Sequence, residues 1–292
     1  MSQHSEAEDL FFEEIDPATK QIYAWIDESL SRGQDNVINR ASSASQCERK
    51  LWYKKNGEPG EQMDARAIIN FALGDLTEAV VVAFLKAACV GPDKLYSEVQ
   101  FGESAGECKV QGRTFEIFKQ KTLITKIVGM EIPGHADGFG KRNSDGKWEL
   151  IEIKSAADFG FRDFLEKGPG DYINQSHCLM MSEDALALGI RTVRFLYLKK
   201  NTGHIASRSY EFDTDVASEV ANKFIAANQE QIPERPYSPI AETFRSKPTG
   251  KIKLPWQCSY CPYTTTCWTN TEMELKSGKP VYYIKNKTEE IA

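Results

Sequence analysis

The chain has 292 residues, of which 41% are hydrophobic and 27% are charged, and its net charge at pH 7 is −6. This composition is typical of a soluble globular protein, and the length suits one large domain or two small ones. The acidic balance counts mildly against nucleic-acid binding, although a local basic channel is compatible with it. No run of about 18 apolar residues stands out and the acidic start does not resemble a signal peptide, so no membrane span is expected.

Helices and strands can be predicted in chain order from apolar spacing and turn chemistry. Asp16-Pro17 begins an amphipathic helix that ends near Gly33, because Asp is a good N-cap and Pro suits the first helical position. Later segments keep either a helical period or a strand-like pattern bounded by turn residues. The predicted helices are a short one around Cys47, then 61–88, helical segments within 158–188, and 216–228. The predicted strands are 95–101, 112–118, 123–130, 192–198 and 204–212, and Val281–Ile284 is expected to be an edge strand. Residues 231–257 are expected to be irregular.

The stretch from Gly134 to Ser155 carries the strongest chemical signal. Ile127 to Phe139 and Trp148 to Lys154 are β-prone, and the NSDG sequence between them favours a turn. Because alternate strand residues share a face, Glu152 and Lys154 point the same way.

The hairpin can bring Asp137 beside this pair. An Asp followed by Glu-x-Lys on the neighbouring strand is typical of sites that hold a divalent cation and activate water. The alternative is a turn aspartate beside an ordinary cross-strand ion pair.

Seven cysteines are an odd number in a chain too large to need a disulfide framework, which indicates reduced thiols in an intracellular protein. Cys258, Cys261 and Cys267 have the spacing C-x2-C-x5-C and supply three metal ligands. Cys47 is the best candidate for a fourth, which would join the two ends of a domain. Both zinc and iron–sulfur centres accept four thiolates, and the three-plus-one spacing favours a [4Fe–4S] cluster, with Zn²⁺ as the alternative.

Together these motifs resemble the PD-(D/E)XK nucleases over roughly residues 38–270. The cysteines resemble the RecB-like iron–sulfur branch, which includes CRISPR-associated RecB-like exonucleases, the AddB nuclease domain and phage exonucleases. The first cysteine motif matches Ser43, Cys47, Arg49 and Tyr53. The remaining family motifs match Gly74 with Glu78, Gly134 with Asp137, Glu152 with Lys154, and Gln175. The chain departs from the pattern in having Glu78 where iron–sulfur members often have His, in the position of Pro133, and in lacking a Tyr about four residues after Gln175.

The resemblance implies an α/β, restriction-endonuclease-like core with a mixed central sheet flanked by helices, and a four-Cys subdomain that joins its N- and C-terminal parts. It implies an N-terminal segment over 1–37, a nuclease domain over 38–270 with cluster elements at 38–55 and 256–270, and a tail over 271–292.

The family's roles can be assigned to residues of this chain. Glu78, Asp137, Glu152 and the Ile153 carbonyl would hold Mg²⁺ or Mn²⁺. Lys154 would orient a water and stabilise developing charge, and Gln175 would position the nucleophile or a phosphate. The residues expected to contact DNA are Arg40, Arg49, Lys50, Tyr53 and Trp268.

The leading functional hypothesis is a metal-dependent DNA exonuclease that acts on single-stranded ends in recombination, repair or phage replication. One alternative has the same chemistry but trims spacer precursors with a CRISPR integrase. Another is a metal-stapled DNA-binding or partner-docking subunit that does not cut, and a third is a structural zinc protein with coincidental carboxylates. A helicase, recombinase or integrase partner, a homo-oligomer and a cytoplasmic setting in a prokaryotic or phage-infected cell fit these readings.

Overall fold

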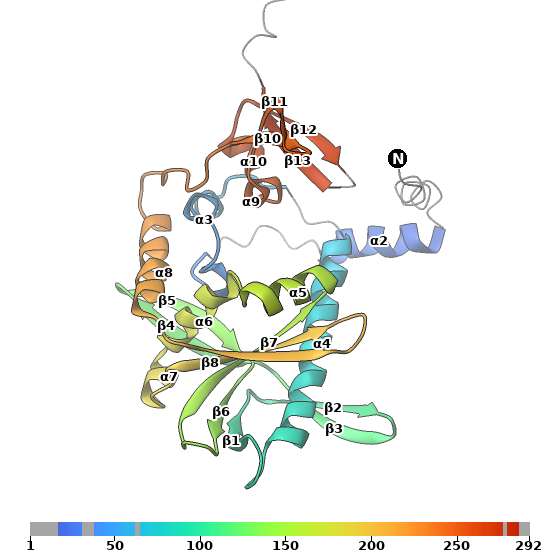
Figure 1. Ribbon diagram of the computed structural model, residues 1–292, viewed down its shortest axis with the longest axis vertical. Helices are drawn as coiled ribbons and strands as arrows, with labels where there is room; N and C mark the ends of the chain where they lie inside the picture. The colour runs from blue at the N-terminus through green and yellow to red at the C-terminus, as the bar shows by residue number, and fades with distance from the viewer. Residues whose placement is uncertain (1–16, 31–37, 62–64, 277–278, 286–292) are drawn as a thin grey trace, which may run out of the picture. The chain divides into compact units, whose positions relative to one another are not determined.

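The computed structural model describes residues 17–30, 38–61, 65–276 and 279–285. The chain divides into two compact units, and Figure 1 shows their helices and strands. Unit 1 comprises Met1–Asn36, Cys47–Ile68 and Gln229–Ala292, and unit 2 comprises Val37–Gln46 and Ile69–Asn228. Each unit is therefore assembled from segments that are distant in the sequence.

Unit 2 is built on a five-stranded sheet with the order β1-β6-β7-β8-β9. Strands β7 and β8 are parallel, and the other neighbours are antiparallel, so the sheet is mixed. Its strands are β1 (Tyr96–Gln100), β6 (Gly138–Arg142), β7 (Trp148–Ala156), β8 (Thr192–Lys199) and β9 (Ile205–Glu211).

The predicted hairpin at the centre of this sheet is confirmed, with one refinement. Strands β6 and β7 pair antiparallel, with Phe139 opposite Leu150, and Gly146 takes the positive φ of 69° that closes the turn. The first predicted strand is in fact two strands that meet at Asp137. Residues before Asp137 form β5 (Met130–Ala136), which pairs with β4 (Lys121–Ile127) rather than with β7. The chain therefore changes sheets at this aspartate.

Helices cover both faces of the central sheet (Figure 1). On one face, α4 (Ala65–Cys89) packs Val81 and Leu85 against Ile151 and Ile153 of β7. The opposite core contains Leu150 and Phe195 together with apolar side chains of the later helices. These helices are α5 (Asp158–Lys167), α6 (Tyr172–Met180), α7 (Glu183–Ala187) and α8 (Thr214–Ala227). The expected α/β class, with a mixed sheet flanked by helices, is thus confirmed.

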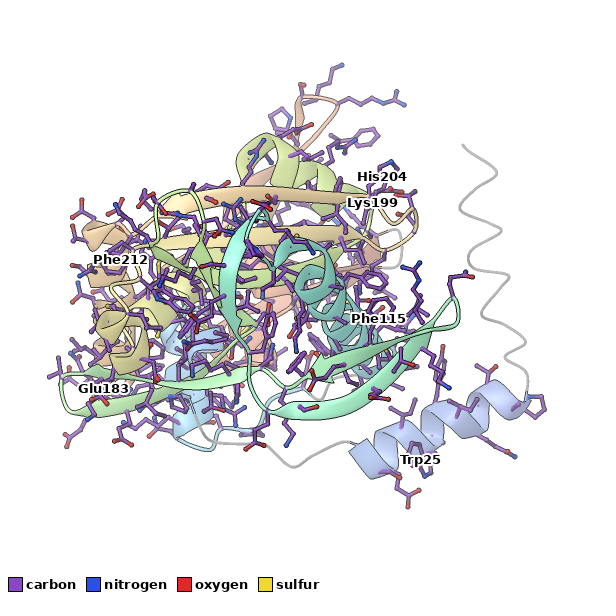
Figure 2. The ribbon with its side chains drawn as sticks, turned by 90° about the horizontal axis from the view of Figure 1, so that it is seen from below. Trp25, Phe115, Glu183, Lys199, His204 and Phe212 are labelled. Atoms are coloured by element: carbon purple, nitrogen blue, oxygen red, sulfur yellow. The ribbon has the colours of Figure 1, made fainter. Side chains whose placement is uncertain are left out.

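A two-stranded hairpin extends unit 2 beside α4. It is formed by β2 (Ser104–Val110) and β3 (Arg113–Phe118). Phe115 of β3, labelled in Figure 2, lies edge-on to Phe84 of α4 with 5.3 Å between ring centroids. This contact and the tilted pair of Phe101 and Phe118, at 5.1 Å, attach the base of the hairpin to the helix and to the end of β1.

Helix α4 is long and apolar enough to cross a membrane by length and composition, with a mean hydropathy of 1.8 over its most apolar window. One such helix is weak evidence for a span, because core helices of soluble proteins pass the same test. Asp75 and Glu78 interrupt its apolar sequence. Glu78 forms a hydrogen bond within unit 2, described below, so the middle of this helix carries a polar contact of the protein itself.

Unit 1 contains short helices and a four-stranded sheet with the order β10-β11-β13-β12. Its helices are α2 (Pro17–Leu30), α3 (Glu48–Lys55), α9 (Trp256–Ser259) and α10 (Thr264–Cys267). Its strands are β10 (Ile240–Phe244), β11 (Lys247–Lys253), β12 (Thr271–Lys276) and β13 (Lys279–Ile284). The first predicted helix is confirmed as α2, although its predicted end near Gly33 lies outside the described residues.

Two expectations about the C-terminal part were wrong. Residues 231–257 are not irregular throughout, because β10 and β11 form a hairpin whose turn residues, Arg245 and Ser246, both have positive φ. Strand β13 is not an edge strand, since it pairs with β11 on one side and β12 on the other. The sheet thus crosses the predicted boundary at 270 and includes part of the predicted tail.

Candidate active site

Three acidic side chains from three different elements converge in unit 2. Glu152 lies on β7, Asp137 lies at the junction of β5 and β6, and Glu78 lies on α4. The hairpin register explains the first two positions, because Gly138 pairs with Ile151 and the preceding Asp137 therefore falls opposite Glu152. The backbone N–H of Ile153 donates to Asp137 Oδ2, which fixes the aspartate against β7.

A residue outside the predicted motifs connects two of these acids. Gln120 Nε2 donates to Glu78 Oε1 at 2.6 Å and to Asp137 Oδ1 at 2.9 Å. The residue lies between β3 and β4, immediately before the pairing of Lys121 with Ala136. The register of that ladder places Gln120 opposite Asp137, and this is the signal that could have identified it.

Glu152 and Lys154 point to the same side of β7, as the strand alternation predicts. Lys154 Nζ lies 2.8 Å from Glu152 Oε2. Glu152 is 1% exposed, and its other oxygen, Oε1, is buried without a hydrogen-bond partner among the described residues. A buried carboxylate oxygen with no donor is costly, and this one belongs to the side chain expected to bind a cation. A hard divalent cation is a partner of the required charge and chemistry.

The charges in the cluster perturb one another strongly. Burial, followed by the neighbouring charge of Asp137, raises the pKa of Glu78 to about 9. Burial also raises the pKa of Glu152 to about 7, although Lys154 opposes this shift. For Lys154, burial lowers the pKa but the surrounding carboxylates, Glu152 first, raise it by more, so the ammonium stays charged. Without a cation, the cluster therefore keeps protons at neutral pH on carboxyl groups that one lysine cannot neutralise, Glu78 first.

Within the parts of the chain that the structure describes, no set of three or more His, Cys, Asp or Glu side chains has the close spacing of a formed metal site. The donor set nonetheless suits a divalent cation, because it contains three carboxyl groups, one of which, Glu152, has an oxygen without a hydrogen-bond partner among the described residues. Ile153 stands between Glu152 and Lys154, and its peptide N–H already contacts Asp137. Its peptide group is therefore part of the cluster.

Helix α6 supplies the remaining predicted side chain. The Tyr172 ring centre lies 5.2 Å from Lys154 Nζ, which places the start of α6 at the cluster. Gln175 is half-buried and lies three residues further along, on the same helix face as Tyr172. His177 is a structural residue, because its Nδ1 lies 2.8 Å from the Ile173 carbonyl oxygen and its Nε2 accepts from Asp213 N–H at 2.9 Å. It also stacks on Phe212, which is labelled in Figure 2.

The four cysteines predicted to share a metal all belong to unit 1. Cys47 immediately precedes α3, Cys258 lies in α9, Cys261 follows α9, and Cys267 ends α10. Burial raises the pKa of the Cys258 thiol to about 11, and the charges of Cys261, Cys267 and Cys47 add to this shift. All seven cysteines of the chain, each in a described segment, are free thiols.

The predicted DNA contacts of unit 1 mostly have other roles. The Arg49 guanidinium donates to the Pro233 carbonyl at 3.0 Å, and Tyr53 is 6% exposed and packs on Tyr263. The Trp268 ring is covered by Arg235 at 4.3 Å. Tyr53 therefore does not offer the open ring face that base stacking needs, and Arg235 occupies one face of the half-buried Trp268.

The remaining predicted DNA contacts are Lys50 in unit 1 and Arg40 in unit 2. Lys50 lies near the thiols, since its charge lowers the pKa of Cys261 while burial of that thiol raises it by more. Arg40, in unit 2, is exposed at the start of the 3-10 turn Ala41–Ser43.

No family model and no curated protein matches this chain. Among solved structures, the crystal structure of SSO0001 is similar, with a TM-score of 0.40 and 16% sequence identity. The match covers 86% of this chain and 96% of that chain. A likeness of this strength supports no argument about function, so the candidate site rests on its own geometry.

Proposed function

We propose that this protein is a divalent-metal-dependent deoxyribonuclease of the PD-(D/E)XK type. The observation that carries the proposal is the buried, unpartnered oxygen of Glu152 beside Lys154, with Asp137 and Glu78 completing the acidic cluster. A structural ion pair would satisfy both oxygens of its carboxylate. A cation site leaves one of them for the metal.

The residues have distinct chemical roles in this proposal. A Mg²⁺ or Mn²⁺ ion held by Glu78, Asp137, Glu152 and the Ile153 carbonyl would make bound water more acidic and neutralise charge on the scissile phosphate. Lys154 keeps its proton, so it can orient a water molecule and stabilise negative charge that builds on the phosphate. Gln175 is proposed to position that water or a phosphate oxygen from α6.

The four thiols of unit 1 are proposed to bind a [4Fe–4S] cluster, with Zn²⁺ as the alternative. Four free cysteines of unit 1, three of which influence the pKa of the fourth, Cys258, provide donor atoms that suit either centre. The segments that carry Cys47 and Cys258 are about two hundred residues apart in the sequence, so a shared centre would close a very long loop. Its proposed role is to hold unit 1 together.

A non-cleaving DNA-binding or docking subunit explains the site less well. Such a protein gains nothing from burying a lysine against a carboxylate whose second oxygen is left unsatisfied, because burial of that charge costs stability. The proposed substrate is DNA with a single-stranded end, and the proposed context is recombination, repair or phage replication.

The test is hydrolysis of end-labelled single-stranded DNA by protein purified without oxygen. We expect cleavage with Mg²⁺ or Mn²⁺, none with a chelator, and a loss of at least about 100-fold in Asp137→Ala and in Lys154→Ala. Far-UV circular dichroism of each variant checks that it is folded. Wild-type protein that leaves DNA intact with either metal, or a folded Lys154→Ala variant that cuts at the normal rate, would contradict the proposal.

A further inference from the structure

Gln120 is the polar side chain at the acidic cluster that the proposed mechanism does not use. Its amide nitrogen donates to carboxylates from two elements, Glu78 of α4 and Asp137 of the β5–β6 junction. Gln120 is exposed, whereas Asp137 is 2% exposed. The Gln120 amide thus lies on the more exposed side of the cluster. The residue itself belongs to the segment that links β3 to β4.

Backbone hydrogen bonds fix the position of the β3–β4 link that carries Gln120. Gly102 N–H donates to the Lys119 carbonyl at 3.1 Å, and Lys119 N–H donates to the Glu103 carbonyl at 2.8 Å. A Cβ atom on Gly102 would lie 2.5 Å from the carbonyl oxygens of both Lys119 and Gln120, so any side chain there would displace the Gln120 backbone. With the Lys121–Ala136 register on the other side, Gln120 is held from two directions.

The chemistry of the two hydrogen bonds matters for a cation site. Each bond occupies one carboxylate oxygen, and a neutral amide does so without bringing a positive charge that would repel a metal. The bonds also restrict rotation of Glu78 and Asp137. Partners outside the ligand set that orient ligands in this way are worth about 10- to 100-fold in metal affinity or activity.

We propose that Gln120 is a positioning residue that orients Glu78 and Asp137 and thereby sets the affinity of the site for divalent cations. This inference rests on the proposed metal site. The alternative is a purely structural role, in which Gln120 would only connect the β3–β4 link to α4. Removing the Gln120 side chain would then change the stability of the protein and leave its metal affinity unchanged.

The experiment is calorimetric titration of metal-free protein with Mn²⁺, without DNA, for wild type and the Gln120→Ala, Gln120→Asn and Lys119→Ala variants. Gln120→Ala should bind Mn²⁺ about 10- to 100-fold more weakly. Gln120→Asn should be intermediate or equally weak, because its shorter side chain cannot reach both carboxylates. Lys119→Ala is the matched control, since Lys119 lies in the same link and pairs with the exposed Glu103. Its Mn²⁺ affinity should stay within about twofold of wild type.

Two further measurements separate the possible failures. The thermal midpoint of metal-free Gln120→Ala should match that of wild type, whereas a lower midpoint with unchanged Mn²⁺ affinity would show a structural role and overturn the inference. Gly102→Ala should also weaken Mn²⁺ binding, because it displaces the Gln120 backbone. If wild type and Asp137→Ala both fail to bind Mn²⁺, the proposed function itself fails. Wild-type binding that Gln120→Ala retains overturns the role of Gln120 alone.

Discussion

The acidic cluster of unit 2 and the cysteine group of unit 1 bring their residues together in different ways. In the acidic cluster, strand register places Asp137 opposite Glu152 and Gln120 opposite Asp137, so the backbone alone determines most of the geometry. In the cysteine group, Cys47 and the C-terminal trio lie on short helices and loops. If each group binds its proposed metal, the acidic cluster should keep its arrangement when that metal is removed, and the cysteine group should not.

The largest effect is expected from the cysteine group. If the four thiols share a metal as proposed, Cys258→Ser should remove it and unfold unit 1, because structural metals contribute on the order of 10–16 kcal/mol to small domains. Metal content per chain and thermal unfolding by circular dichroism measure the two parts of this prediction. Cys108→Ser is the control, since Cys108 lies in the β2–β3 hairpin of unit 2. Full metal content in Cys258→Ser would show that the thiols do not share a metal.

The next largest effect concerns the buried hydrogen-bond network around Glu149 of β7. Glu149 of β7 is fully buried and accepts from Tyr96 Oη and Arg194 Nε, both at 2.6 Å, and from Arg142 Nη1 at 3.1 Å. Glu149→Ala leaves two guanidinium groups without this buried counter-charge, which should cost about 3–5 kcal/mol in unfolding free energy. Urea denaturation measures the loss. A cost below about 1 kcal/mol would mean that the network does not hold the sheet together.

A smaller effect should appear as a pH dependence of the metal-free protein. The pKa values of Glu78 and Glu152 are raised to about 9 and about 7, so the folded state binds protons that the unfolded state releases above about 4.5. Stability should therefore be highest near pH 5 and fall as pH rises toward 9, by up to about 1.4 kcal/mol per pH unit for each proton. Saturating Mn²⁺ should flatten this slope. Denaturation midpoints that rise over the same range would contradict the assignment.

The smallest effect is expected at the surface of unit 2. Lys126 Nζ lies 2.7 Å from Glu183 Oε1, and both side chains are largely exposed (Glu183 is labelled in Figure 2). Exposed pairs of this kind are screened by solvent and contribute little. Lys126→Ala should leave the denaturation midpoint unchanged within error. A clear loss of stability would show that exposed ion pairs contribute more to the free energy of unfolding than solvent screening allows.

The sequence predicted best what local patterns control. The NSDG turn and the alternation of Leu150, Glu152 and Lys154 gave the β6–β7 hairpin and the shared side of the Glu–Lys pair. Asp16-Pro17 and the apolar spacing after it gave α2.

The sequence failed where local composition is ambiguous or where pairing is non-local. The β10–β11 hairpin pairs locally, with Phe244 opposite Lys247, but it was missed because its lysines and Pro248 resemble a loop. A contact that stabilises it comes from β13, whose Tyr283 Oη donates to the 8% exposed Glu242 of β10. Gln120 was missed because its position depends on how β4 pairs with β5, and no short motif encodes that. Tyr172 was missed for a similar reason, since the fold of α6 onto β7 brings it to Lys154.

The most direct test of the central claim is anomalous diffraction from crystals grown with Mn²⁺. The account predicts one or two Mn²⁺ peaks bounded by Glu78, Asp137 and Glu152, with Glu152 Oε1 among the ligands. Ordered Mn²⁺ elsewhere in the crystal and none at these carboxylates would contradict it.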